Sequence, residues 1–299
     1  MAIINQKLNI GFKRLATLAL AATAPLAGAA TIAAVPAAAQ TQSAADRATY
    51  ADLVRIAEQS ELVIRAQIRR QTRVIAERAP GLQPGFARLY IEADTQALIA
   101  GDTAIGQSIV YLADVPLDAD GKPPKLKKQQ VLLFANTVPG RPVSSRGQEI
   151  QLIGPNGQLP YSPEFEARLR PVLTSLSSAD LPPVVEGIAD ALAVQGTLAG
   201  ESETQVFLRT QDRSPVSLTV LRRPGQPPVW GVSWGEIIDA AARSPERGTL
   251  RWYRLACALP AELPSSANLA RDAAARRLAA ADYAFVIEQL GECDRAITE

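Results

Sequence analysis

The chain has 299 residues, with 31 lysines and arginines, 30 aspartates and glutamates, and a formal net charge of +1. A near-neutral chain has no global field that would draw it to nucleic acid or to an anionic membrane. It contains no histidine, which excludes histidine-based acid–base catalysis and histidine metal sites.

Residues 1–39 have the pattern of a secretory signal peptide. Lys7, Lys13 and Arg14 form a basic start, an alanine-rich apolar run follows from Leu15, and small residues lead up to Ala39. The run is also long enough for an uncleaved membrane anchor, but its alanines and threonines and its small-residue ending favour cleavage. We therefore expect a periplasmic or secreted protein without a transmembrane segment after cleavage.

The pattern of residues 40–160 predicts one helix followed by a set of strands. Residues 40–60 form an N-terminal segment in which apolar side chains recur at helical spacing, at Tyr50, Leu53, Val54 and Ala57. Apolar and polar residues then alternate in five stretches: from Glu61, over residues 88–99, and over Ser108–Val115, Gln129–Ala135 and Gln148–Ile153. The fourth is apolar on both faces and should be the most buried. Five such strands favour a small antiparallel barrel over residues 61–160.

The second half predicts an α+β arrangement. Ser162-Pro163 is a typical helix start for a connecting helix over residues 161–181, which Pro171 should kink or shorten. Pro182-Pro183 marks a boundary, and residues 182–299 form the last unit. Its strands are expected over residues 187–196, 204–210, 216–223 and 229–234, as a β-meander, and its helices over residues 236–243, 249–258 and 268–290.

The two cysteines, Cys257 and Cys293, are expected to form a disulfide, because an exported protein meets an oxidising compartment. Helical spacing places Cys257 on one face with Leu250 and Tyr253. It also places Cys293 on the apolar face of the last helix, and packing of the two faces would join the sulfurs. The alternative is two buried free thiols.

Several stretches resemble known exported proteins. ELVIRAQI, QQVLLFA, and EIQLIG with its Pro155-Asn156-Gly157 turn resemble the OB-like barrels of bacterial exported proteins, over residues 61–160. KPPKLKKQQVLLFA, GESETQVFL, VSLTVLRRPGQPPVWGVSWGEI and YRLACALP are similar to exported proteins of sphingomonad-type alphaproteobacteria. The first resemblance implies an OB-like fold, and neither implies an activity or site residues.

The sequence GVSWG, from Gly231 to Gly235, matches the G-x-S-x-G pattern of hydrolase nucleophile elbows. The elbow serine needs a base, which in esterases is histidine, and the chain has none. We interpret the match as a coincidence within a strand, with Ser233 as a helix cap. A serine–lysine pair would avoid the need for histidine.

The lysines beyond the signal peptide are Lys122, Lys125, Lys127 and Lys128. They cluster beside two prolines and indicate an exposed loop, which is a poor environment for a catalytic lysine because such a residue must lose solvation. The functional alternative is an anion-binding patch.

Two groups of carboxylates are candidates for a catalytic pair or a metal site. Glu201 and Glu203 are too close in sequence to flank a sugar ring. Asp114, Asp118 and Asp120 only weakly resemble a calcium loop. With no glycine-rich phosphate loop either, we expect no catalytic residues, no cofactor and no metal.

The expected function is that of a non-catalytic binding or envelope-associated protein. OB-like folds bind ligands across their second and third strands, so the candidate binding surface comprises Arg88, Tyr90, Tyr111 and the four lysines, although cross-strand packing explains the tyrosines equally well. The partner would be another envelope protein or an anionic ligand, not nucleic acid. The alternative is a hydrolase that uses carboxylates or a serine–lysine pair.

Export predicts a defined N-terminus. N-terminal sequencing of the protein from its native host should begin near Gln40 or Thr41. Recovery of an intact Met1 in the membrane fraction would instead identify residues 15–39 as an anchor.

Overall fold

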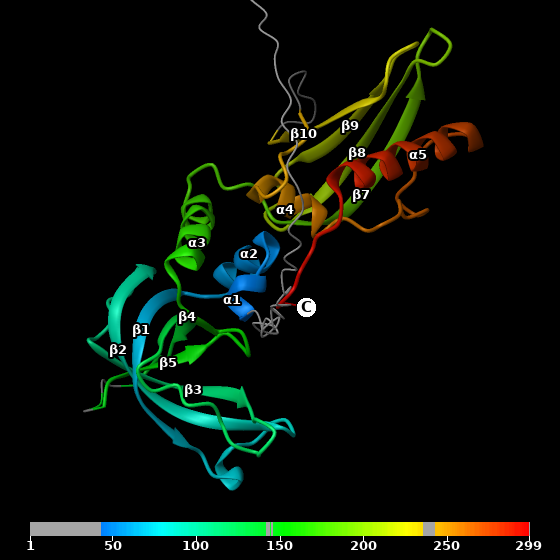
Figure 1. The fold of residues 1–299 in the computed structure, drawn as a ribbon. Helices are drawn as coiled ribbons and strands as arrows, with labels where there is room; N and C mark the ends of the chain where they lie inside the picture. The colour runs from blue at the N-terminus through cyan, green and yellow to red at the C-terminus, as the bar shows by residue number, and fades with distance from the viewer. Residues whose placement is uncertain (1–42, 142–143, 145, 236–242, 299) are drawn as a thin grey trace, which may run out of the picture. The chain divides into compact units, whose positions relative to one another are not determined.

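The computed structural model describes residues 43–141, 144, 146–235 and 243–298, and it has an α+β fold (Figure 1). The N-terminal sheet has six strands: β1 Leu62–Arg73, β2 Phe86–Ala100, β3 Ser108–Pro116, β4 Gln130–Thr137, β5 Gln148–Leu152 and β6 Gln158–Pro160. The five predicted strands are present. No sequence pattern marks β6, because three residues are too few to display an alternation.

The first five strands close into a barrel. β1 pairs with β2 on one side and β4 on the other, β2 pairs with β3, and β5 lies between β3 and β4. The β3–β5 pairing is parallel, with Ile109 opposite Gln148 and Val110 opposite Glu149. The prediction of a wholly antiparallel barrel is therefore wrong at this pairing. Alternation identifies strands but does not say which strands become neighbours.

The barrel is filled by alternate side chains of its strands. Ile64, Ile68, Ile91 and Ile109 are fully buried in its interior. β4 is buried on both faces, as predicted: Val131, Leu133 and Ala135 face the barrel interior, whereas Leu132 and Phe134 join a second core cluster outside it. β4 thus connects the barrel to the rest of the core.

Helices α2, Tyr50–Glu58, and α3, Pro163–Leu176, contribute to this second cluster with Leu53, Ile56, Phe165 and Leu169. Ser162 caps α3 as expected, since its Oγ accepts a hydrogen bond from the Phe165 N–H at 3.1 Å. The helix continues through Pro171 to Leu176, so the proline does not shorten it. Two short elements, α1 Ala44–Arg47 and the 3₁₀ turn Ala76–Arg78, complete the N-terminal half.

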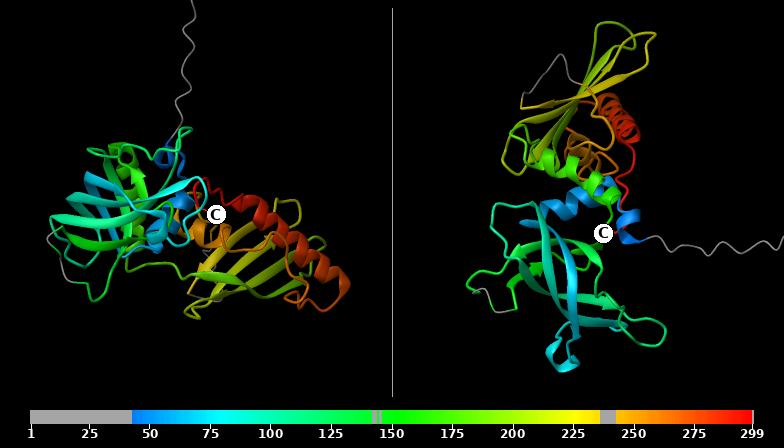
Figure 2. Two further views of the ribbon diagram at one scale, coloured as in Figure 1. Left: turned by 90° about the horizontal axis from the view of Figure 1, so that it is seen from below. Right: turned by 60° about the vertical axis from the view of Figure 1, so that its left-hand side comes forward.

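The second sheet is an antiparallel meander in the order β10-β9-β8-β7. Its strands are β7 Val185–Gln195, β8 Ser202–Thr210, β9 Val216–Arg222 and β10 Val229–Trp234, as the sequence predicts. Two further helices are α4 Leu250–Ala256 and α5 Ala273–Leu290, and α5 lies along one face of the sheet in both views of Figure 2.

Helix α5 starts five residues later than predicted. Ala267 and Leu269 make backbone hydrogen bonds to Ala191 of β7, so the chain is extended there, and Asp272 then caps the helix. α5 ends at Leu290, and Gly291 follows with φ 68°, so Cys293 lies beyond the helix and not on its face. No helix among the described residues has the length and apolarity needed to cross a bilayer.

Some expectations lie outside the described residues. They are the signal peptide over residues 1–39 and the predicted helix over residues 236–243, except for Arg243. The described residues belong to one compact unit, and the expected boundary at Pro182-Pro183 stays a prediction.

The predicted disulfide is confirmed. Cys257 and Cys293 are bonded with an S–S distance of 2.03 Å and a sequence separation of 36 residues. The bond connects the end of α4 to the segment that follows α5.

That segment, residues 292–298, will be called the C-terminal strap. It crosses back to α2 and is held there by the Asp52 carboxylate, which is fully buried. One oxygen, Oδ2, accepts hydrogen bonds from the N–H and hydroxyl of Thr49 and from the Ala296 N–H, at 2.9 to 3.0 Å. The other, Oδ1, accepts from the Ile297 and Thr298 N–H groups and the Thr298 hydroxyl, at 2.6 to 3.3 Å.

Burial of Asp52 disfavours its charged form, but the hydrogen bonds from Thr298, Thr49 and Ala296 outweigh burial and hold the pKa of Asp52 below its usual value. The ionised carboxylate therefore stabilises the folded chain. This contribution is present above a pH of about 4 and is lost as the pH falls through the lowered pKa.

Replacing Asp52 tests this arrangement. Asp52→Asn should lower the free energy of unfolding at neutral pH by at least about 3 kcal/mol, because several donors lose a charged acceptor. Urea denaturation at pH 7 and pH 3 should show that the difference from the wild type shrinks at the lower pH. Asp46→Asn is the matched control, since Asp46 forms the same capping box with Ser43 but is exposed. Equal effects of the two variants would contradict a special role for Asp52.

Removal of the disulfide gives a second prediction. Cys257→Ala/Cys293→Ala should lower the free energy of unfolding by about 4 kcal/mol, since a bridge across 36 residues restricts the unfolded chain. Urea denaturation under non-reducing conditions measures the difference. An unchanged midpoint would show that the strap is held by its other contacts alone.

Candidate functional site

The structure separates the residues of the predicted binding surface. Arg88 lies on β2 and forms a two-pronged ion pair with Asp114 of β3, with both N–O distances at 2.7 Å. It also donates to the Pro80 carbonyl, so its guanidinium is occupied by the barrel itself. Tyr90 is opposite Leu112 in the same pair of strands, and Leu112 is 50% exposed.

Tyr111 lies on the other side of β3, in the barrel interior. It is 2% exposed and its hydroxyl donates to Gln158 Oε1 at 2.7 Å. Burial raises the pKa of this hydroxyl. Successive side chains of a strand point to opposite faces of the sheet. Arg88 and Tyr90 lie opposite Asp114 and Leu112 of β3. Tyr111 directly precedes Leu112, so its side chain lies on the other face. It does not share a surface with Arg88 and Tyr90.

The four lysines are exposed on the loop between β3 and β4, as the sequence indicates. Lys122 faces Asp120 at 3.8 Å. Leu126, which lies between Lys125 and Lys127 in sequence, is buried in the barrel core. Its N–H donates to Gln71 Oε1 at 2.6 Å. The loop therefore has an anchoring role in the barrel, while its lysines extend into solvent.

The other motifs have structural explanations. Ser233 is 1% exposed within β10, opposite Ser217 of β9, so the GVSWG match lies on a strand. Glu203 accepts a hydrogen bond from Gln205, and Glu201 accepts one from the Leu198 N–H in the preceding turn. No cluster of three or more carboxylate or cysteine ligands occurs within the described residues.

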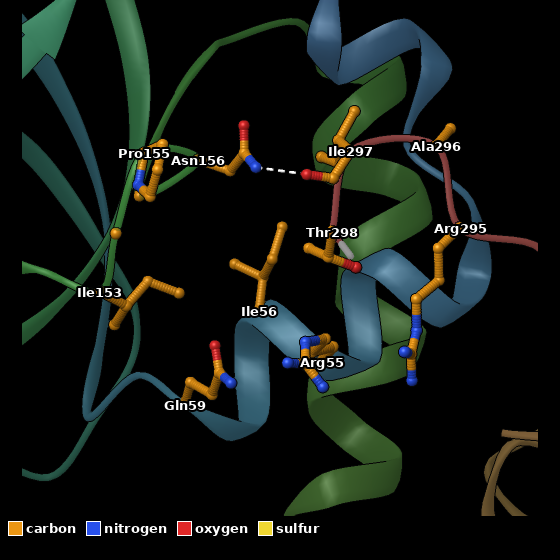
Figure 3. A pocket seen from close by; sticks show the side chains of 12 residues that line it. Arg55, Ile56, Gln59, Ile153, Pro155, Asn156, Arg295, Ala296, Ile297 and Thr298 are labelled. Atoms are coloured by element: carbon orange, nitrogen blue, oxygen red, sulfur yellow. Dashed lines mark hydrogen bonds between the residues drawn. The ribbon is translucent and has the colours of Figure 1, made fainter. Parts of the chain in front are cut away.

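A cavity of about 480 Å³ occurs where three segments distant in sequence meet (Figure 3). Helix α2 contributes Arg55, Ile56 and Gln59. The turn between β5 and β6 contributes residues 153–157, and the strap contributes residues 295–298. Its volume lies within the range of small-molecule sites, which is about 300 to 1,000 Å³.

One side of this cavity is cationic. In Figure 3 the side chains of Arg55, Gln59 and Arg295 lie along its lower edge. No ion pair joins Arg55 or Arg295 to an acid within the described ranges. Arg295 interacts with the Tyr253 hydroxyl. Burial and the charge of Glu58 raise the pKa of Tyr253, and the charge and hydrogen bond of Arg295 partly oppose this.

Arg295 also carries an unsatisfied donor. Its Nε is buried and has no acceptor among the residues that the structure describes. Buried polar groups are nearly always paired, so the donor marks a position where an acceptor is missing.

The rest of the cavity is largely apolar. Ile56 of α2 and Ile153 of the turn extend towards each other at its centre in Figure 3, and Ile297 of the strap belongs to the same core cluster. Asn156 closes the far side, where its amide donates to the Ile297 carbonyl. The cavity therefore combines an apolar centre with a cationic edge.

Sequence reasoning did not find this site. Ile56 belongs to the helix predicted over residues 40–60, and the Pro155-Asn156-Gly157 turn and Cys293 were each identified. Their convergence depends on the return of the strap to α2, for which the only signal was the position of Cys293 two residues before Arg295.

No protein-family model matches the chain, and no curated protein matches it.

Proposed function

We propose that this chain is an exported, non-catalytic binding protein that holds an anionic ligand in the cavity between α2, the β5–β6 turn and the strap. The observation that carries the proposal is the pair of arginines, Arg55 and Arg295, without acidic partners among the described residues. Guanidinium groups recognise carboxylates and phosphates through paired hydrogen bonds.

Export is supported by two independent features. The N-terminal residues have a signal-peptide pattern, and the Cys257–Cys293 disulfide is typical of oxidising compartments. We therefore propose that the protein acts in the periplasm or outside the cell, in keeping with its resemblance to exported proteins of sphingomonad-type bacteria.

We also propose that the barrel is OB-like. Its strand order, β1-β2-β3-β5-β4 with closure onto β1, supports this assignment, since OB folds are five-stranded Greek-key barrels. In this protein the cavity lies beside the barrel and not on its second and third strands, where Arg88 is already paired with Asp114.

The two other hypotheses have less support. Ser233 is buried in β10, whereas the four lysines are exposed on the barrel loop, and this placement offers nothing to a serine–lysine hydrolase. Binding of an envelope protein would use exposed apolar surface such as that of Leu112 on β3. The lysine loop is the rival anion site.

Anion binding can be assigned to one site or the other by mutation. Inorganic phosphate, acetate and hexanoate, at constant ionic strength, should raise the melting temperature, because a ligand that binds only the folded state stabilises it. Arg55→Ala/Arg295→Ala should weaken binding at least about tenfold, as expected when charged hydrogen bonds are lost.

Lys125→Ala/Lys127→Ala is the control that removes an equal charge from the loop, and it should leave binding unchanged. Loss of binding in the lysine variant alone would show that anions bind at the lysine loop and not in the cavity. No stabilisation by any of the three anions would contradict the proposed function.

A further inference from the structure

We propose that the ligand of this cavity is an amphipathic organic anion, in which one carboxylate or phosphate group is attached to an apolar body. This inference rests on the proposed anion-binding function and specifies the chemical class of its ligand. The carboxylate or phosphate would lie at the cationic edge, and the apolar body would lie against the isoleucines.

The cationic edge can hold a single oxyanion group. Arg55 and Arg295 supply guanidinium donors, and Gln59 supplies an amide donor beside them. Neither Arg55 nor Arg295 forms an ion pair among the described residues, so an anion at this edge would not have to displace an acidic side chain. No carboxylate side chain is among the residues that line the cavity, which disfavours a cation as ligand.

One buried acid, Asp52, contacts strap residues that line the cavity. Both of its oxygens accept hydrogen bonds, with donors from Thr49, Ala296, Ile297 and Thr298. Those donors stabilise its charge locally. The field of Asp52 at the cavity is therefore offset in part by the N–H groups that bind it.

The remaining wall is apolar and would add nothing to the binding of a small inorganic ion. Ile153 and Ile297 are only partly buried and line the cavity beside Ile56 and Pro155. Contact with an alkyl or other apolar group would remove their surface from water, and a bare phosphate would leave it exposed. None of the residues that line the cavity is aromatic, so a sugar or base, which proteins commonly stack on aromatic rings, fits it less well.

The apolar wall is held in place before any ligand arrives. Asp52 holds residues 296–298, Asn156 binds the Ile297 carbonyl, and the disulfide fixes Cys293. A preformed wall reduces the ordering cost of binding. The affinity gained from apolar contact should therefore appear in full as the ligand is lengthened.

A homologous series tests the inference. Calorimetric titration with acetate, butyrate, hexanoate and octanoate should show affinity rising about fourfold for each added methylene until the cavity is filled. Matched alcohols should bind at least tenfold more weakly than the carboxylates. Inorganic phosphate against butyl and hexyl phosphate repeats the comparison and shows which head group is preferred.

Two variants separate the roles of the walls. Ile153→Ser should flatten the dependence on chain length while preserving the weak affinity for acetate. Arg55→Ala should weaken every anion by a similar factor and preserve the slope. Ile75→Ser is the matched control, because Ile75 is 59% exposed and does not line the cavity. If Ile153→Ser does not fold, the wild-type series alone still decides the question.

The outcomes distinguish this inference from the proposed function. Anion binding without dependence on chain length would overturn the inference and leave the proposed function intact. Alcohols that bind as tightly as carboxylates would overturn the charged part of the inference. Absence of binding throughout the series would overturn both.

Discussion

The carboxylate of Asp52 is the interaction on which the arrangement of the chain depends. A buried charge is costly unless hydrogen bonds compensate for it, and here six donors do so. Two come from Thr49, at the start of α2, and four come from the last described residues of the strap. One aspartate thus joins positions that are nearly 250 residues apart in sequence, and it does so while it stays ionised.

The strap that Asp52 holds is also a wall of the cavity. Cys293 fixes one end of the strap to α4, Asp52 fixes the other, and Arg295 lies between these two anchors. A long arginine side chain loses much conformational freedom when it is ordered, and anchoring on both sides reduces what remains to be lost on binding. Stability and the proposed site are therefore coupled through the same short segment.

Polar and charged side chains of the barrel strands make contacts within the folded chain. Arg88 is paired with Asp114, Arg65 with Glu166 of α3, and Gln71 holds the loop that contains Leu126. These contacts explain why residues that suggest a binding face in the sequence are poor candidates for one in the structure. Exposed apolar surface remains at Leu112 on the outer face of β3.

The sequence by itself determined the strands, most helices and the disulfide, because these follow from short-range periodicity and from the pairing of two cysteines. It did not reveal the parallel β3–β5 pairing, the strand β6 or the interior position of Tyr111, which depend on the neighbours of each strand. The sequence also did not predict the cavity. Arg55, Ile153 and Arg295 lie in segments with no common pattern, and only the return of the strap to α2, stabilised by the Asp52 hydrogen bonds, brings them together.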